Sequence, residues 1–360
     1  MGKGSSGASR QRTVNVTYRG RRAAVLENGA LRVTVLEEGG HIAEIFDKRA
    51  GVSPLWTLPW ASIEPSAYNP DTHPEYGNGP DAQLLAGIMG HNLCLDTFGA
   101  PSPEEFLAGV PVHGEASIVP YQIRSIDNQL VTTARLPRAG LLFERRLVLR
   151  GRGVHVTEAV ENLAASDRPI AWTQHVTLGP PFLEPGTTRF RATATRSKVF
   201  EGRFGDADYL VPAAEFEWPR APEAGGGFAD LQVFNDFAAS GGFTTHLMDP
   251  AREYAFFVSF TPQFRLAFGY IWKQQDFPWM GIWEENHSRA NPPWNGRSLA
   301  RGMEFGVSPF PESRRTMTQR GRLFGVPTYR WLPAGSRVEL EYWAVTQEAR
   351  TIPEYLSPPA

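Results

Sequence analysis

Along most of the chain, apolar and polar residues alternate with a period of two. Just after residue 30, for example, Leu31, Val33 and Val35 are separated by polar residues. This alternation puts successive side chains on opposite faces, as in a half-buried β-strand. Runs with strand-like composition and spacing predict further strands at Ala116–Ile123, Leu130–Leu136, Leu141–Leu149, Val154–Glu161, Ile170–Thr177, Tyr254–Phe260, Phe264–Trp272 and Arg337–Thr346.

Helical signals are few and short by comparison. The clearest is Pro103–Ala108, where a proline and two glutamates are typical of a helix start. A dozen or more strands with scarcely any helix predict an all-β protein built as a large antiparallel sandwich or barrel. No repeat of fixed period is present, which disfavours a propeller. We therefore expect a flexible tail over residues 1–20 and a single domain over residues 21–360.

Two long stretches, residues 57–112 and 273–301, lack a strand pattern. Connections of this length inside a compact domain usually carry function. The second stretch contains Trp279, Trp283 and Trp294 among polar residues. Because aromatic rings line many small-molecule pockets, we expect Trp279 and Trp283 to form the walls of a binding site. Two alternatives stay open: these rings pack the loop onto the sheet, or they form a subunit contact in a homodimer.

Charge and composition exclude several classes of function. Lys and Arg total 36 against 38 Asp and Glu, a net charge of −2, so we expect neither a nucleic-acid nor a membrane partner. Apolar runs such as Ala255–Val258 fall far short of the roughly 20 residues that cross a bilayer. The single Cys94 excludes an internal disulfide and a cysteine-based zinc site. Residues 1–12 lack the apolar centre of a secretory signal, which favours a cytoplasmic location.

A lone carboxylate stands between two glycines in the segment Ala300–Phe310. On a strand, Glu304 shares its face with Gly302 and Gly306, which have no side chains. This arrangement leaves room for a flat ligand beside the carboxylate. The alternative is a solvent-exposed glutamate near a sheet edge.

Histidines supply the matching candidates for proton transfer. On the predicted strand Ile170–Thr177, His175 shares its face with two threonines, and a neutral histidine suits general acid catalysis near pH 7. The alternative is a histidine bonded to hydroxyls of its neighbours. His113 precedes Gly114, which permits a sharp turn and a close ligand. Taken alone, this segment favours a turn histidine that pairs with Glu115. His91 and Asn92 form a weaker polar pair in the first long stretch.

The order of these segments resembles the galactose mutarotase-like family, which includes the aldose 1-epimerases. The resemblance extends from about residue 25 to residue 347 and implies a large β-sandwich, or supersandwich, that opens and recloses sugar rings. Its motifs in this sequence are Glu27–Val33, Pro54–Trp56, His113–Glu115, Val154–Asn162, Trp172–His175 and Gly302–Pro309.

The resemblance also assigns roles. It implies that His175 is the general acid, that Glu304 is the general base and that His113 bonds the ring oxygen of the sugar. His91 and Asn92 occupy the place of a substrate-binding Arg/Asn segment, although the arginine is absent. The substrate-binding aspartate of the family has no clear counterpart here, and Asp230 and Asp249 lie in the right region without a matching context.

Ring opening requires a base at the C1 hydroxyl and an acid at the ring oxygen, with no metal and no organic cofactor. We expect His175 and Glu304 to converge on one concave sheet face and to bracket a monosaccharide or modified sugar without touching each other. One alternative is a carbohydrate-binding protein without turnover. Another is a glycoside hydrolase or lyase, in which Glu284 or Glu285 would act with Glu304.

Overall fold

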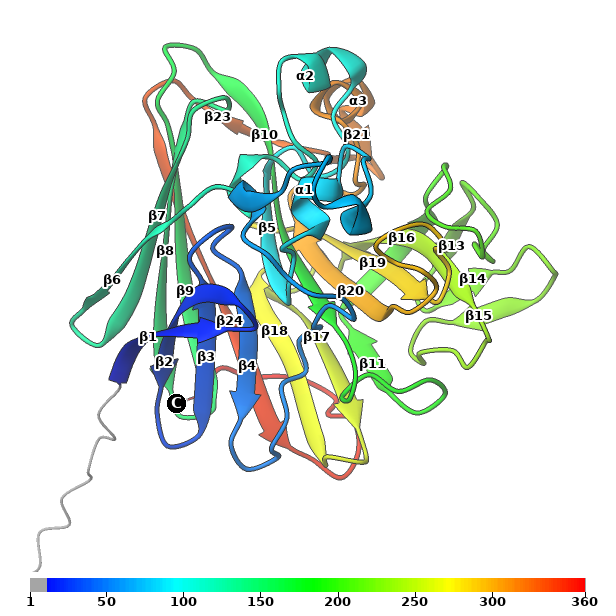
Figure 1. The fold of residues 1–360 in the computed structure, drawn as a ribbon. Coiled ribbons are helices and arrows are strands. Elements are labelled where there is room, and N and C mark those ends of the chain that lie inside the picture. The colour runs from blue at the N-terminus through cyan, green and yellow to red at the C-terminus, as the bar shows by residue number, and fades with distance from the viewer. Residues whose placement is uncertain (1–11, 360) are drawn as a thin grey trace, which may run out of the picture.

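The computed structural model describes residues 12–359, and two large antiparallel sheets make up most of this chain (Figure 1). The larger sheet has twelve strands, and β23 pairs with β10 off its main path. In spatial order its strands are β1 (Arg12–Tyr18), β2 (Arg21–Glu27), β3 (Leu31–Leu36), β4 (Ile42–Asp47), β5 (His91–Asp96), β10 (Arg168–Leu178), β20 (Leu299–Gly306), β19 (Trp279–Asn286), β16 (Ser240–Met248), β12 (Ala194–Val199) and β13 (Glu215–Glu217), with β23 at Arg330–Leu332.

The smaller sheet has eight strands and packs against the larger one. In order these are β11 (Arg189–Ala192), β17 (Tyr254–Thr261), β18 (Leu266–Lys273), β24 (Arg337–Glu348), β9 (Gly153–Asn162), β8 (Leu141–Arg150), β7 (Gln129–Leu136) and β6 (Gln122–Ile126). Two short hairpins are β14 (Arg220–Pro222) with β15 (Phe228–Asp230), and β21 (Arg322–Leu323) with β22 (Val326–Pro327).

Helices are short and gather at one end of the molecule in Figure 1. They are α1 (Ala82–Leu85), α2 (Pro103–Leu107) and α3 (Arg314–Arg320), together with the 3₁₀ turns η1 (Pro65–Ala67), η2 (Pro74–Tyr76) and η3 (Glu115–Ser117). In α2, the Ser102 hydroxyl and the Glu105 carboxylate cap each other's backbone amides, which explains why this helix was readable from the sequence. Within residues 12–359, no helix has the length and apolar character needed to cross a membrane.

The main core lies between the two sheets. Trp172 and Met303 of the larger sheet pack in one cluster with Phe143, Val156 and Tyr342 of the smaller sheet. The predicted all-β architecture is confirmed, and it is a sandwich of sheets. Because alternate residues on a strand point to opposite faces, the neighbours of Trp172 and Met303 in sequence are turned away from this core.

Three sequence predictions about elements are wrong. We predicted a flexible tail over residues 1–20, but residues 12–18 form β1, which pairs with β2. The rest of the predicted tail up to residue 11 lies outside the described residues. The strand predicted at Ala116–Ile123 is instead η3 followed by β6. Its first two residues, Ala116 and Ser117, are buried in a tight turn, where Ser117 donates to the Leu93 carbonyl oxygen.

The third error is the lack of strands in the two long stretches, where β5 and β19 lie. All residues of both strands are buried, the polar ones included. Strands covered on both faces lose the alternation that identifies half-exposed strands, which removed one signal for β5 and β19. Burial alone does not account for the error, because β10, β17 and β18 are nearly as buried and were predicted.

Candidate active site

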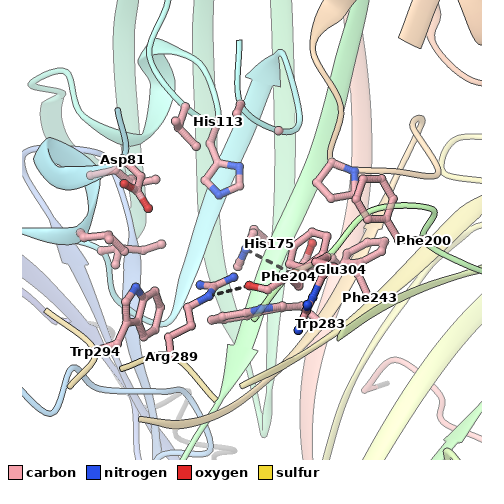
Figure 2. A pocket seen from close by; sticks show the side chains of 18 of the residues that line it. Asp81, His113, His175, Phe200, Phe204, Phe243, Trp283, Arg289, Trp294 and Glu304 are labelled. Carbon is pink, nitrogen blue, oxygen red and sulfur yellow. Dashed lines mark hydrogen bonds and ion pairs between the residues drawn. The ribbon is translucent and has the colours of Figure 1, made fainter. Parts of the chain in front are cut away.

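A cavity of about 280 Å³ opens on the face of the larger sheet that is turned away from the main core. Its floor is formed by β10, β20 and β19. Aromatic side chains dominate the wall, among them Trp56, Phe204, Phe243, Trp283 and Trp294. Polar groups reach it from a few places only, and Figure 2 shows His175 and Glu304 side by side, with Arg289 nearby and Asp81 farther away.

His175 and Glu304 meet at this floor. Strands β10 and β20 are antiparallel neighbours, and the pairs Thr173–Gly306 and Thr177–Gly302 set their register. This register brings His175 Nε2 to within 3.2 Å of Glu304 Oε1. The expected convergence on one sheet face is therefore confirmed. The expectation that the two groups do not touch is wrong, because adjacent strands place them side by side rather than on opposite walls.

Burial controls the protonation of this pair. The side chains are 7% and 2% exposed, respectively. Burial raises the pKa of the Glu304 carboxyl well above its ordinary value, since the charged form loses its solvation. Burial also lowers the pKa of His175 well below 6.5, and the neighbouring His113 lowers it further. Both shifts favour a pair that holds one proton and carries no net charge.

His113 lies directly beside His175. The two rings are T-shaped with centroids 5.1 Å apart. His113 has a positive φ of 63°, and Gly114 follows at 77°, where a Cβ would come within 2.0 Å of the Leu95 carbonyl oxygen. Only glycine fits at position 114, so the turn can pass close to β5 and place His113 beside that strand. Pairing with Glu115 is not seen, because the Glu115 carboxylate accepts from the backbone amide of Ala139.

The hydrogen bond of His113 restricts its role. Nδ1 contacts the carbonyl oxygen of Phe98, which can only accept, so Nδ1 carries the proton. Burial lowers the pKa of this histidine, which favours the neutral ring. In the neutral ring Nε2 is an acceptor and suits a sugar hydroxyl. It does not suit a ring oxygen, which has no hydrogen to donate.

Trp283 and Trp294 form one wall with Arg289 beside them. Their ring centroids are 5.8 Å apart, and the Arg289 guanidinium lies 5.5 Å and 4.8 Å from the two centroids. Arg289 is held by the buried Glu285 at 3.5 Å and by a hydrogen bond to the Phe204 carbonyl oxygen. Within residues 12–359, the buried Nε1 of Trp283 has no hydrogen-bond acceptor.

The two glycines that flank Glu304 leave room for neighbouring protein atoms, not for a ligand. A Cβ at Gly302 would lie 2.4 Å from Glu304 Oε1, and a Cβ at Gly306 would lie 2.4 Å from the Thr173 hydroxyl. Across the ladder, a Cβ at Gly281 would lie 2.4 Å from the Phe243 ring. The space over these glycines is thus filled by the Glu304 carboxylate, the Thr173 hydroxyl and the Phe243 ring. The gap that we expected there for a flat ligand is absent.

Three further predicted site residues lie outside the cavity lining. His91 faces the main core, where it contacts Tyr270 and Gln174, so its predicted role at the substrate is wrong. Asn92 shares the sheet face of His175 but is buried against the Ser117 hydroxyl, and its predicted contact with substrate is also wrong.

Trp279 is fully buried, with Nε1 donating to the Pro327 carbonyl oxygen, and is therefore not the wall we expected. Asp230 and Asp249 also lie away from the cavity lining. Asp249 is paired with Arg252 instead.

The carboxylates proposed for hydrolysis are likewise placed elsewhere. Glu284 points to the opposite face, where it accepts from Asn235 and Ser240. Glu285 accepts from the backbone amides of Ser288 and Arg289. Neither lines the cavity, so neither can act with Glu304 on a bond held there.

Sequence reasoning missed three charged residues of the cavity: Asp81, Arg203 and Arg289. Asp81 directly precedes α1 in the first long stretch, and Arg289 lies in the second. The only available signal was the location of these two residues in stretches too long to be simple connections. No arginine lies beside Asn92, but Arg203 and Arg289 bring guanidinium groups to the cavity from other parts of the chain. Among residues 12–359, no three His, Cys, Asp or Glu side chains are grouped to hold a metal ion.

Comparisons with known proteins show the fold. No family model matches the chain, and no curated protein matches its sequence. A proposed aldose 1-epimerase from Klebsiella pneumoniae superposes with a TM-score of 0.65 at 12% identity, over 94% of this chain and 88% of that one. A galactose mutarotase-like protein from Clostridium acetobutylicum gives 0.61 at 12% identity, over 94% and 99%. A galactose mutarotase related enzyme from Lactobacillus acidophilus gives 0.56 at 10% identity, over 92% and 99%. The chain has the galactose mutarotase-like fold.

Proposed function

We propose that this protein is a carbohydrate-active isomerase that interconverts the anomers of a monosaccharide or modified sugar, in the manner of an aldose 1-epimerase. The observation that carries the proposal is the contact of His175 with Glu304 on the floor of an aromatic cavity. A cytoplasmic location and a homodimer stay predictions from the sequence.

The contact between the two groups suits the reacting edge of a sugar. The hydroxyl oxygen O1 and the ring oxygen O5 are bonded to the same carbon, C1. Two side chains in contact can therefore address both oxygens from one side of the ring, with Glu304 acting through Oε2, because its Oε1 is buried against His175. The sugar then lies over the pair with its O1–C1–O5 edge facing the floor, instead of between the two groups.

The pair of His175 and Glu304 holds one titratable proton, and this proton is enough for the whole reaction. Because the pKa shifts leave this proton on Glu304, it first passes across the contact to His175. The ionised Glu304 then removes the proton from the C1 hydroxyl, the C1–O5 bond breaks as the C1–O1 double bond forms, and the protonated His175 gives its proton to O5. Rotation about C1–C2 and the reverse transfers produce the other anomer. One proton enters the pair and one leaves it, so the buried site holds the same number of protons throughout. Each transfer contributes on the order of 10²- to 10⁴-fold.

The remaining lining matches the rest of a sugar. Trp283 and Trp294 offer flat surfaces to the apolar C–H faces of a pyranose. His113 Nε2 accepts a hydroxyl proton, while Asp81 and Arg289 supply an acceptor and donors for further hydroxyls.

Saturation-exchange NMR on free aldoses tests the proposal. The protein should accelerate exchange between anomer resonances, and both Glu304→Gln and His175→Asn should lower this acceleration by about 10²-fold or more. Glu215→Gln, at an exposed glutamate on β13, is the matched control and should exchange sugars like the parent protein. Undiminished exchange in both cavity variants would overturn the assignment.

A carbohydrate-binding protein without turnover is the second candidate, and the burial of Glu304 favours it. A carboxyl group whose pKa is raised well above 4.5 by burial is protonated more readily and is less available as a base. This candidate predicts saturable sugar binding with an anomer exchange rate equal to that of the buffer.

A further inference from the structure

A second hollow, of about 420 Å³, lies on another part of the surface. Four arginines line it: Arg138 in the β7–β8 turn, Arg168 at the start of β10, and Arg314 and Arg315 at the start of α3. These segments are far apart in the sequence and meet only in the folded chain. The hollow shares no lining residue with the cavity of His175 and Glu304.

The arginines are held in place by a buried carboxylate behind them. Asp96, at the end of β5, accepts from both Arg168 and Arg314. Its side chain is 4% exposed, so it orients the two guanidinium groups without itself facing solvent. Arg314 also lies 3.8 Å from Glu105, the acidic residue of the lining.

Positive charge is in excess among the residues that line the hollow. Arg315 is 3.5 Å from Glu104, which is 68% exposed and so screens weakly. Arg138 donates to the Gly109 carbonyl oxygen and has no ion-pair partner among residues 12–359. The lining thus carries four guanidinium groups against the single carboxylate of Glu105, while Asp96, Glu104 and Glu115 neighbour the arginines without lining the hollow.

Hydrogen-bonding capacity is also unused here. The buried Nε of Arg168 has no acceptor within the described chain, and an unmet donor on a charged group is costly. The hydroxyl side chains of Ser166 and Thr318 line the same hollow. Guanidinium forks together with hydroxyls are the groups that bind tetrahedral oxyanions in proteins.

We propose that this hollow binds a phosphate group, either as inorganic phosphate or as the ester of a small molecule. A tetrahedral dianion matches the positive charge of the lining and accepts from its guanidinium and hydroxyl groups. The volume and the net chain charge of −2 favour a small molecule over nucleic acid, which requires an extended basic surface.

Isothermal titration of the full chain with sodium phosphate at low ionic strength tests the proposal, with sodium chloride at matched ionic strength as the blank. We expect saturable binding that Arg138→Gln and Arg315→Gln each weaken by about tenfold. Both arginines are exposed, so these variants should fold. Arg252→Gln, at an exposed arginine paired with Asp249 elsewhere, is the control and should bind phosphate unchanged.

A parallel titration with glycerol 3-phosphate distinguishes the two sources. Tighter binding of the ester than of inorganic phosphate identifies an organic phosphate as the ligand, and equal or weaker binding identifies phosphate itself. Three results would overturn the proposal: no saturable binding, equal weakening in Arg252→Gln, or weakening by Trp283→Ala while the Arg138 and Arg315 variants bind normally. The last result would place the anion in the other cavity.

Discussion

The imidazole of His175 and the carboxylate of Glu304 are in direct contact, with 3.2 Å between Nε2 and Oε1, although their strands are far apart in the sequence. The contact exists because β10 and β20 are neighbours in the larger sheet and their register aligns the two residues. Two groups so close and so deeply buried titrate as a unit, and the pKa values of the unit belong to neither residue alone.

This coupling predicts the pH dependence of the proposed activity. Turnover needs one proton on the pair, so a second proton stops it on the acid side and loss of the only proton stops it on the alkaline side. Because burial lowers the pKa of His175 well below 6.5, the second proton binds only in more acidic solution. We therefore expect the acid limb of kcat/KM to lie well below pH 6.5, as measured by polarimetry with the uncatalysed rate subtracted.

The matched control for this profile is His155→Gln, at a histidine stacked on Trp343 away from the cavity, which should leave the profile unchanged. An acid limb at or above pH 6.5 in the parent protein would contradict the coupling.

Gly302→Ala should damage activity more than stability. The new Cβ would lie 2.4 Å from Glu304 Oε1, so the flexible end of that side chain must move away from His175. A displacement of this kind costs on the order of 10²-fold in rate. The rate of anomer exchange and the free energy of unfolding in urea, both measured on the same sample, show whether activity falls more than stability. Gly29→Ala, where a Cβ meets nothing within 4 Å, is the control and should change neither. Full activity in Gly302→Ala would show that the observed carboxylate position is dispensable.

Substitutions of the two tryptophans on β19 should have different effects, one on sugar binding and the other on stability. Trp283 lines the cavity, so Trp283→Ala removes a sugar-facing wall and should raise the dissociation constant by about tenfold. Trp279 is fully buried outside the lining, so Trp279→Ala should lower the free energy of unfolding by about 3–5 kcal/mol and leave sugar affinity of the folded protein unchanged. Titration calorimetry and urea unfolding measure the two effects, and a reversed pattern would contradict the placement.

Buried histidines should make the protein sensitive to acid. Burial lowers the pKa of both His41 and His246 to about 3, against 6.5 in the unfolded chain. Between these values the unfolded state binds more protons, so the free energy of unfolding falls as the pH falls below 6.5. Each such histidine contributes a slope of about 1.4 kcal/mol per pH unit.

His246→Gln should therefore flatten the acid slope by about one histidine's share. The glutamine keeps a polar group near the Ser197 and Thr244 hydroxyls that now contact the ring. Urea unfolding at a series of pH values between 6.5 and about 4 checks this expectation. Parallel slopes in parent and variant would show that His246 is already charged in the folded state.

Periodicity recovered the half-exposed strands because their apolar residues alternate with polar ones. It missed β5 and β19, which are covered on both faces, and it placed η3 on a strand. At the site, the strand pattern selected His175 and Glu304, and the aromatic content of the second long stretch selected Trp283; all three line one cavity. Sequence reasoning failed for His91 and Trp279, because no local pattern tells which face of a fully buried strand meets a cavity.

By itself the sequence determined the all-β class, most of the strands and the residue types able to exchange protons, because these follow from local alternation and side-chain chemistry. Only the tertiary structure decided that His175 touches Glu304, that Asp81 and Arg289 reach the same cavity, and that His113 presents an acceptor. Contacts between distant segments depend on strand order and register, and burial, which sets the pKa values, exists only once the sheets have packed.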